Sequence, residues 1–269
     1  IPGHRFERGL DETLNGASLA AYDLSEAEGL DDLHHAEGVI AEAQKLAAET
    51  WKAKKTFFLV NGTTCGNEAM VLSSVKEGEK IIVPRNVHKS VLMGLILSGA
   101  TPVYVMPEYS TKWQMWGGVT PETIEKAFAE TPDAKAVLLV SPTYYGLCSD
   151  LQAIAEICHC HNAALLVDEA HGSHLYFSEQ LPLGALESGA DACAQSIHKT
   201  AGSFTQSSFL SLGSGRLDEA RVAANLQMVQ STSPSYLLMA SLDAARRGMA
   251  LHGKERMELA LELGQRARQ

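Results

Sequence analysis

Two short apolar runs, AVLLV at residues 136–140 and ALLVD at residues 164–168, decide the fold class of this chain. Both are apolar almost throughout, which predicts strands that helices cover on both faces of a sheet. A helix-patterned segment lies between them at residues 151–161, with Asp150 in position to cap it. A strand, a helix and a second strand in this order predict a βαβ unit with two parallel strands.

The same rhythm continues on either side of this unit. Further strand-like runs occupy residues 57–60, 80–83, 102–105, 192–196 and 207–212, and helical patterns occupy residues 36–51, 66–75, 87–97, 121–129, 217–230 and 235–265. We therefore expect an α/β fold, built as three α/β/α layers around a mostly parallel central sheet. We assign residues 1–50 to an N-terminal arm and helix, residues 51–245 to a large cofactor-binding domain, and residues 246–269 to the start of a linker helix.

The composition is that of an ordinary globular protein and excludes several classes of function. With 22 Lys and Arg against 32 Asp and Glu, the formal charge is −10, so no basic surplus is available to neutralise a nucleic acid. The apolar runs are too short to span a membrane. Five cysteines at irregular spacing, with no signal peptide, favour reduced thiols in a cytoplasm. The chain begins at Ile1 and stops at Gln269 inside a helical pattern, so we expect a fragment of a longer protein.

Polar and small residues follow four of the predicted strands. They occupy residues 61–67 (NGTTCGN), 85–89 (RNVHK), 141–146 (SPTYYG) and 168–172 (DEAHG). In an open α/β sheet, ligands bind beyond the carboxyl ends of the strands. The four segments therefore predict a single binding site at that edge of the sheet.

Three motifs indicate the chemistry of this site, and each also has a plainer interpretation. The hydroxyls of Thr63 and Thr64 near a helix N-terminus fit a phosphate site or a simple strand-to-helix turn, but no P-loop sequence follows. Asp168 ends a buried strand and needs a partner, such as a protonated pyridine nitrogen, unless it caps the next turn. Lys199, past a strand end in a small-residue context, is a candidate Schiff-base lysine or an ordinary surface lysine.

Histidine and cysteine clusters raise the question of a metal site. Residues 158–161 read CHCH, but residues two apart on a helix point to different faces, and no second cluster completes four ligands. We therefore expect no metal there, and none at the paired histidines of residues 34–35 or at His171 and His174. The string DEAH also occurs in helicases, but no Walker lysine accompanies it here.

Eight motifs, in the same order along the chain, resemble the Orn/Lys/Arg decarboxylase family of pyridoxal-phosphate enzymes. They are PGHR (2–5), GLDDLHHAEG (29–38), FFLVNGTTCGNEAM (57–70), VPRNVHKSV (83–91), SPTYYG (141–146), LLVDEAHGSH (165–174), QSIHKT (195–200) and STSPSYLLMASLDAAR (231–246). The chain is similar above all to the shorter bacterial and cyanobacterial arginine decarboxylases. This resemblance implies the aspartate-aminotransferase-type fold and decarboxylation of arginine, or of lysine or ornithine, to the amine, as in polyamine biosynthesis.

The resemblance implies that five residues surround the ring of pyridoxal 5'-phosphate. Lys199 would bind the cofactor covalently, and Asp168 would pair with the pyridine nitrogen. His88 would stack over one face of the ring, and Ala170 would support the other face. Thr143 would lie near the phenolic oxygen.

A second group would hold the phosphate or lie beside it. Thr64, the amide of Cys65 and Ser196 would bind the phosphate, and His198 would lie near both phosphate and substrate. His171, which would also lie at the cofactor, stands where relatives known for acid resistance carry an aromatic residue.

The resemblance also implies a homodimer or higher oligomer, with each site built at a subunit interface. Ser231 and Thr232 of one subunit would contact the phosphate bound to the other. A plainer interpretation of this loop is a helix N-cap at Ser233 followed by Pro234. The acid-resistance relatives carry an N-terminal wing domain, and family members continue into a small C-terminal domain that encloses the substrate. We expect this chain to lack both.

Two alternative functions remain open from the residues alone. The same cofactor serves lyases, aldol cleavage and transamination, because the bond that breaks is the one held perpendicular to the ring, and a sequence does not fix that angle. A metal hydrolase that uses the histidine-rich loops, or a catalytically silent scaffold, would not use this cofactor at all.

Overall fold

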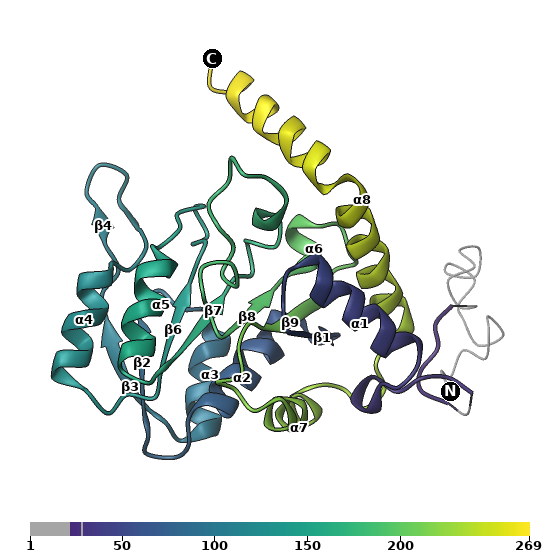
Figure 1. Cartoon of the computed structure of the whole chain (residues 1–269), viewed down its shortest axis with the longest axis horizontal. Helices are drawn as coiled ribbons and strands as arrows, with labels where there is room; N and C mark the ends of the chain where they lie inside the picture. The colour runs from purple at the N-terminus through teal and green to yellow at the C-terminus, as the bar shows by residue number, and fades with distance from the viewer. Residues whose placement is uncertain (1–21, 28) are drawn as a thin grey trace.

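The computed structural model describes residues 22–27 and 29–269 and has the layered architecture that the sequence predicts (Figure 1). The PGHR motif and most of the predicted N-terminal arm lie outside the described residues. The strands are β1 (Lys55–Leu59), β2 (Lys80–Pro84), β3 (Thr101–Val105), β4 (Tyr109–Ser110), β5 (Met115–Trp116), β6 (Ala136–Val140), β7 (Ala164–Asp168), β8 (Ala192–Gln195) and β9 (Ser208–Leu212). The helices are η2 (Leu33–His35), α1 (Val39–Thr50), α2 (Gly62–Ser74), α3 (Lys89–Ser98), α4 (Pro121–Glu130), α5 (Leu151–Cys160), η3 (Leu175–Phe177), α6 (Ile197–Thr200), α7 (Glu219–Val229) and α8 (Tyr236–Arg266).

A seven-stranded sheet forms the centre of the molecule, in the order β1-β9-β8-β7-β6-β2-β3. The strands from β8 to β3 pair in parallel, and β9 pairs antiparallel with both β8 and β1. Only β9 therefore runs against the other strands of this sheet, which confirms the mostly parallel arrangement. The two runs that predicted the fold lie side by side, with Leu138 opposite Leu166 and Val140 opposite Asp168.

Helices cover both faces of the sheet because successive side chains of a strand point to opposite faces. In β6, Ala136 and Leu138 share a core with α2, α3 and α7, whereas Val137 and Leu139 share a core with α4 and α5. On this second face, α1 and α8 cover β1 and β9 around the buried Trp51. The three-layer α/β/α prediction is confirmed, and Figure 1 shows the helices on either side of the sheet.

Local sequence signals account for two helix starts. Thr120 accepts a hydrogen bond from the Thr123 amide at 3.3 Å, with Pro121 at the first helical position of α4. Asp150 accepts one from the Ala153 amide at 3.1 Å at the start of α5. The predicted cap at Asp150 is confirmed.

Two other helix starts differ from the sequence prediction. The helix α2 begins at Gly62 and not at residue 66, so the NGTT turn forms the first turn of the helix itself. The helix α8 begins at Tyr236 with Ser235 as its N-cap, so the alternative interpretation with Ser233 as the cap is wrong. The sequence also missed the small β4–β5 hairpin, in which Tyr109 packs against Trp116 with ring centroids 4.7 Å apart.

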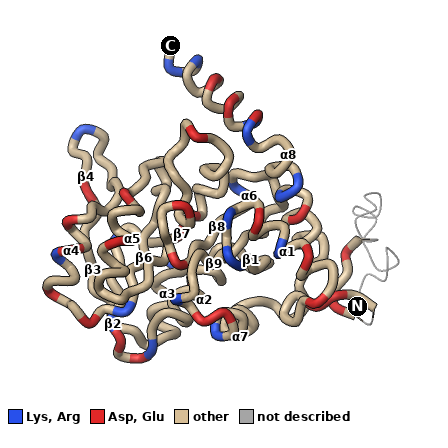
Figure 2. Tube along the Cα trace, viewed as in Figure 1, with Lys and Arg blue, Asp and Glu red and all other residues tan. Residues whose placement is uncertain are grey.

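The C-terminal helix α8 lies along one side of the sheet and then projects away from it (Figure 1). It is continuous across residue 246, where the sequence analysis begins the linker, and the division into domains stays a prediction. Charged residues occur mainly in the helices and loops around the sheet (Figure 2). None of the helices in the described part of the chain is long and apolar enough to cross a membrane.

Candidate active site

A cleft of about 580 Å³ opens at the carboxyl ends of β6, β7 and β8, where α2 and α3 begin. All four polar segments that follow the strands contribute to it. Its lining residues are Gly62, Thr63, Thr64, Asn67, Asn86, Val87, His88, Lys89, Val140, Tyr144, Asp168, Ala170, His171, Ser196, His198 and Lys199. Eight of the twelve residues to which the family resemblance assigns a role are among them, and Thr63 lines the cleft as well.

The first turn of α2 forms one wall of the cleft. Gly62 has φ +75°, a conformation that L side chains rarely adopt, so glycine suits this sharp entry into the helix. The Thr63 hydroxyl lies 2.6 Å from the Ser196 hydroxyl, which ties this turn to the end of β8. The first amides of a helix have no acceptor within the helix, and they favour an anion at this position. This wall can therefore bind a phosphate.

Close packing brings that turn onto the sheet. A Cβ at Gly66 would lie 2.8 Å from Leu59 Cδ1 and 3.1 Å from Ala194 Cβ, so only glycine fits without a shift. Gly66 thereby lets α2 approach β1 and β8 closely.

Asp168 lies at the floor of the cleft and is 3% exposed. Its carboxylate accepts hydrogen bonds from Asn67 Nδ2 at 2.8 Å and from the Ala170 amide at 3.2 Å. The second bond means that Asp168 also caps the next turn, as the plainer interpretation held. Burial raises the pKa of Asp168, although these bonds and the nearby His88 and Lys199 oppose the rise. A buried carboxylate held only by neutral donors is costly, so a cationic group in the cleft would stabilise it.

A chain of hydrogen bonds links this carboxylate to His88, the N-cap of α3. Asn67 Nδ2 also donates to Ser90 Oγ at 2.9 Å, and Ser90 Oγ lies 2.8 Å from His88 Nδ1. His88 Nδ1 accepts from the Ser90 amide at 3.2 Å, which fixes the orientation of the imidazole in the cleft. These hydrogen bonds therefore fix the position of His88 relative to Asp168 at the floor of the cleft.

Two buried amide oxygens at the cleft have no protein partner. They are Oδ1 of Asn67 and Oδ1 of Asn86, and both residues line the cleft. Buried polar atoms are nearly always hydrogen-bonded. Two unpaired acceptors in a cleft that also holds the Asp168 carboxylate therefore indicate a binding site for a polar ligand that carries hydrogen-bond donors.

Lys199 and His171 meet in the cleft. Lys199, on the short helix α6, has Nζ 3.3 Å from His171 Nε2. Partial burial lowers the pKa of His171, and the positive charge of Lys199 lowers it further. A neutral His171 can exchange a hydrogen bond with Nζ without adding a second positive charge, and Nζ is the candidate nucleophile of the cleft. His198 Nδ1 lies 3.0 Å from the Ser207 carbonyl oxygen, so that nitrogen is the donor.

Four residues selected from the sequence do not line the cleft. The Cys65 thiol is buried and donates to the Gly62 carbonyl at 3.1 Å. This bond does not involve the Cys65 amide, for which the sequence predicts a contact with the phosphate. Thr143 Oγ1 accepts from the Leu147 amide at 3.2 Å within the SPTYYG turn. Ser231 and Thr232 are exposed in the loop before α8. The roles assigned to these four stay predictions.

The sequence analysis assigned no role to Asn67, Ser90, Asn86 or Tyr144, all of which lie in or beside the cleft. Asn67 had a detectable signal, since it follows Thr63 by four residues and so shares its helix face. The contact of Asn67 with Asp168 spans 101 residues, and no local pattern predicts it.

Glu169, the neighbour of Asp168, points away from the cleft and is fully buried. Its carboxylate accepts from the Ala185 amide at 2.7 Å, from the Tyr176 hydroxyl at 2.8 Å and from Gln195 Nε2 at 2.8 Å. These bonds connect the ends of β7 and β8 with the loop that follows. Burial nevertheless raises the pKa of Glu169 from 4.5 to about 7.

This raised pKa predicts a dependence of stability on pH. Between about 4.5 and about 7 the folded protein binds a proton at Glu169 that the unfolded chain releases, so the free energy of unfolding falls as the pH rises. The contribution is roughly 3 kcal/mol over this range. Urea denaturation of the wild type and Glu169→Gln at several pH values measures it as the difference between the two slopes. His171 and Asp168 titrate in both proteins and cancel, and equal slopes would contradict the prediction.

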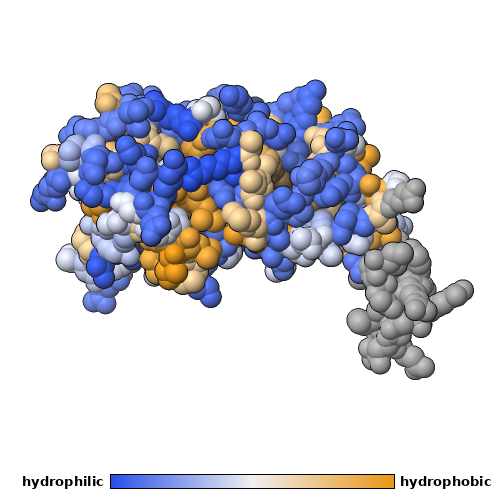
Figure 3. All heavy atoms as spheres, turned by 90° about the horizontal axis from the view of Figure 1, so that it is seen from below, coloured by the Kyte–Doolittle hydropathy of each residue, from blue (hydrophilic) through white to orange (hydrophobic). Residues whose placement is uncertain are grey.

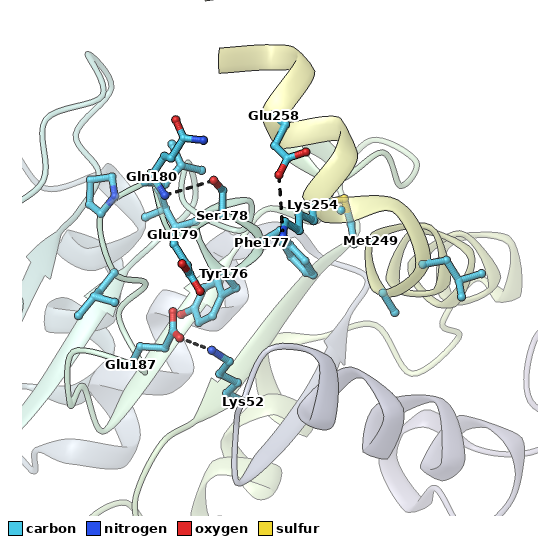
Figure 4. Close-up of a pocket in the computed structure, with 17 residues that line it drawn as sticks. Lys52, Tyr176, Phe177, Ser178, Glu179, Gln180, Glu187, Met249, Lys254 and Glu258 are labelled. Carbon is cyan, nitrogen blue, oxygen red and sulfur yellow. Dashed lines mark hydrogen bonds and ion pairs between the residues drawn. The ribbon is translucent and has the colours of Figure 1, made fainter. Parts of the chain in front are cut away.

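A second cavity, of about 630 Å³, lies between residues 175–183 and α8 (Figure 4). Lys52 forms an ion pair with Glu187 on one side, and Phe177 packs over Gly253 of α8 on the other. None of the residues selected from the sequence lines this cavity. The candidate active site is therefore the cleft at the strand ends.

The histidine and cysteine run at residues 158–161 has other contacts. His159 Nε2 lies 3.0 Å from the buried Asp191 carboxylate, and His161 stacks on Phe128 with ring centroids 4.3 Å apart. Across residues 22–27 and 29–269, no group of three or more His, Cys, Asp or Glu is arranged to hold a metal ion.

Comparison with known proteins identifies the family. The arginine decarboxylase of Halalkalibacterium halodurans is 46% identical over 271 aligned residues, and that of Bacillus subtilis is 44% identical. Each alignment covers 100% of this chain and 55% of the relative, so the chain spans about half the length of these curated relatives. Lysine decarboxylase A from Pseudomonas aeruginosa superposes with a TM-score of 0.84 at 27% identity, over 97% of this chain and 39% of that structure. The family model "Orn/Lys/Arg decarboxylase, major domain" matches residues 1–269, and the chain belongs to this family.

Proposed function

We propose that this chain forms the cofactor site of a pyridoxal-phosphate-dependent decarboxylase that converts a basic amino acid, arginine first, to its amine. The observation that carries the proposal is similarity along the whole chain to two arginine decarboxylases. Lysine decarboxylases are related at lower identity, 31% for one from Pseudomonas aeruginosa, which makes lysine the second candidate. Ornithine is the third, from the family description.

The residues of the cleft fit pyridoxal phosphate. The first turn of α2, with Thr64 and Ser196, suits a phosphate. Asp168, buried without a cationic partner in contact, suits a protonated pyridine nitrogen. Lys199 Nζ beside the neutral His171 suits covalent attachment to an aldehyde. When bound, the cofactor supplies an electron sink for the charge that remains on the α-carbon as CO2 leaves.

The chain's own residues supply charge, orientation and protons for this reaction. Asp168 keeps a proton on the pyridine nitrogen, because its negative charge lies in a water-poor site where electrostatic effects are large. His88 and Ala170, which both line the cleft, would hold the ring of the cofactor. Lys199 Nζ, or His198 through Nε2, returns a proton to the α-carbon to complete the amine.

We also infer a homodimer in which Ser231 and Thr232 reach the phosphate of the partner subunit. In their own subunit both side chains are exposed and outside the cleft. The helix α3, which begins at the cleft, exposes the apolar side chains of Leu92, Met93, Ile96 and Leu97. Figure 3 shows an apolar patch on the face of the molecule where α3 lies. Patches of this kind often mark interfaces, and a partner that covers α3 would come close to the cleft.

We infer a cytoplasmic location for the enzyme. The five cysteines are free thiols, as in proteins of reducing compartments.

Release of labelled CO2 tests the proposed reaction. The holoenzyme, given arginine, lysine or ornithine labelled in the α-carboxyl group, should release the label as gas and should do so fastest from arginine. Formation of a keto acid or loss of the side chain without gas release would indicate another reaction of the same cofactor. Absence of a cofactor absorbance band that borohydride removes would contradict the whole proposal.

A further inference from the structure

The cleft presents an electrostatic problem for a basic substrate. Besides Tyr144, its titratable lining residues are the five basic residues His88, Lys89, His171, His198 and Lys199 and a single carboxylic acid, Asp168. Asp168 is 3% exposed and already accepts two hydrogen bonds at the floor. Among the described lining residues, no other carboxylate is available to pair with a cationic side chain. The cleft therefore suits the substrate's carboxylate and the phosphate better than a guanidinium group.

Tyr144 is the aromatic side chain of the cleft, and most of its surface is free. It lines the cleft and yet is 80% exposed, which is unusual for a large ring in a folded protein. Two T-shaped contacts hold the ring: one with His171 at 5.7 Å and 83°, the other with Tyr145 at 5.5 Å and 89°. Since perpendicular neighbours cover little of an aromatic ring, a face of Tyr144 remains open to a ligand.

The contacts of Tyr144 put this ring one side chain away from Lys199. His171 touches Tyr144 on one side, and its Nε2 lies 3.3 Å from Lys199 Nζ on the other. A substrate whose α-amino group reacts at the cofactor held by Lys199 would extend its side chain past His171. The lowered pKa of His171, caused first by partial burial and then by Lys199, keeps that imidazole neutral, so it does not repel a cation.

We propose that Tyr144 recognises the cationic end of the substrate through a cation–π contact with the open face of its ring. This inference rests on the proposed function and names how its substrate class is selected. An aromatic face attracts a cation within about 6 Å, and the planar guanidinium of arginine stacks on it better than the ammonium of lysine. The ring therefore supplies an attraction for the cationic end of the substrate, and it favours arginine over lysine.

Substitutions of Tyr144 in the holoenzyme test this role. Tyr144→Leu should raise the KM for arginine on the order of tenfold while kcat changes little, because the contact is equally strong before and during the reaction. Tyr144→Phe keeps the ring and should stay near the wild-type KM. The inhibition constant or KM of L-citrulline, the neutral isostere of arginine, should be the same in all three proteins. The KM for lysine should rise less in Tyr144→Leu than the KM for arginine does.

The neighbouring ring provides a matched control. Tyr145 is 61% exposed in the same turn and does not line the cleft, although its ring contacts Tyr144, so Tyr145→Leu should raise the KM for arginine far less than Tyr144→Leu does. If Tyr144→Leu raised the KM for arginine and the KM or inhibition constant of citrulline by the same factor, the ring would only shape the cleft, and the proposal would be overturned. An unchanged KM for arginine would overturn it as well. These outcomes leave the proposed function standing, whereas a wild type that releases no CO2 from any basic amino acid would overturn both.

Discussion

Lys199→Ala is expected to reduce decarboxylation by on the order of 10⁴-fold or more, the scale seen when a covalent catalytic group is removed. The reason is that Nζ of Lys199, next to the neutral His171, is the cleft's candidate for covalent attachment to the cofactor. The wild type should show a visible absorbance that borohydride abolishes, with added mass on the peptide that contains Lys199. The variant should show neither signal. Its melting temperature should change little, because Lys199 is exposed and its truncation removes little packing.

A surface lysine serves as the control for this variant. Lys80 pairs with Asp133 at 3.0 Å, far along the sheet from the cleft lining, so Lys80→Ala should keep both the activity and the borohydride signal. Borohydride-reducible absorbance that survives in Lys199→Ala would contradict the assignment of this lysine.

The same variant also tests the proposed dimer by subunit mixing. One subunit carries Lys199→Ala and the other carries alanine at Ser231 and Thr232. In the heterodimer, one of the two sites combines an intact lysine with an intact partner loop, so activity should return above that of either parent. Heterodimers that form and remain inactive would mean that the phosphate site lies within one chain.

The strands were predictable because each apolar run carries its own signal. Residues 136–140 and 164–168 are strands over the same residues in the structure. A short, wholly apolar run between turns is too short for a helix of the core and is typical of a strand that is buried on both faces. The hairpin of β4 and β5 was not predictable, because strands of two residues show no periodicity. The early start of α2 was also hidden, because Gly62, Thr63 and Thr64 are poor helix formers that packing of the helix on the sheet overrides.

Part of the candidate site was predictable from the order of the strands. Residues that follow parallel strands meet at one edge of the sheet, so Asp168, Ser196 and Lys199 could be expected together without any contact information. The contacts that orient them were not accessible, because Asn67 reaches Ser90 and Asp168 across segments that are distant in the chain. The exposure of Tyr144 likewise depends on how the turn at residues 141–146 packs, which its amino-acid sequence does not reveal.

Asp168→Asn is expected to lower the rate by about 10²-fold or more, the scale for losing one preorganised electrostatic group. The substitution keeps the shape of the side chain but removes the negative charge that would hold a proton on the pyridine nitrogen. The structure can absorb the change without a packing defect. The asparagine oxygen can accept from the Ala170 amide, and its NH2 group can donate to Oδ1 of Asn67 if that amide rotates, which exchanges the Asn67–Ser90 hydrogen bond for this new one. The loss should therefore appear in kcat, and cofactor should still bind through its phosphate.

Stability separates this electrostatic role from a structural one. Because burial raises the pKa of Asp168, its charge is costly in the cofactor-free protein, and Asp168→Asn should retain or raise the melting temperature of that form. A structural role predicts the opposite, a lower melting temperature with or without cofactor. Asp150→Asn is the matched control, since Asp150 caps α5 and asparagine caps equally well, so rate and stability should both be kept. A near-wild-type rate in Asp168→Asn would show that the charge at the floor of the cleft does not act on the cofactor.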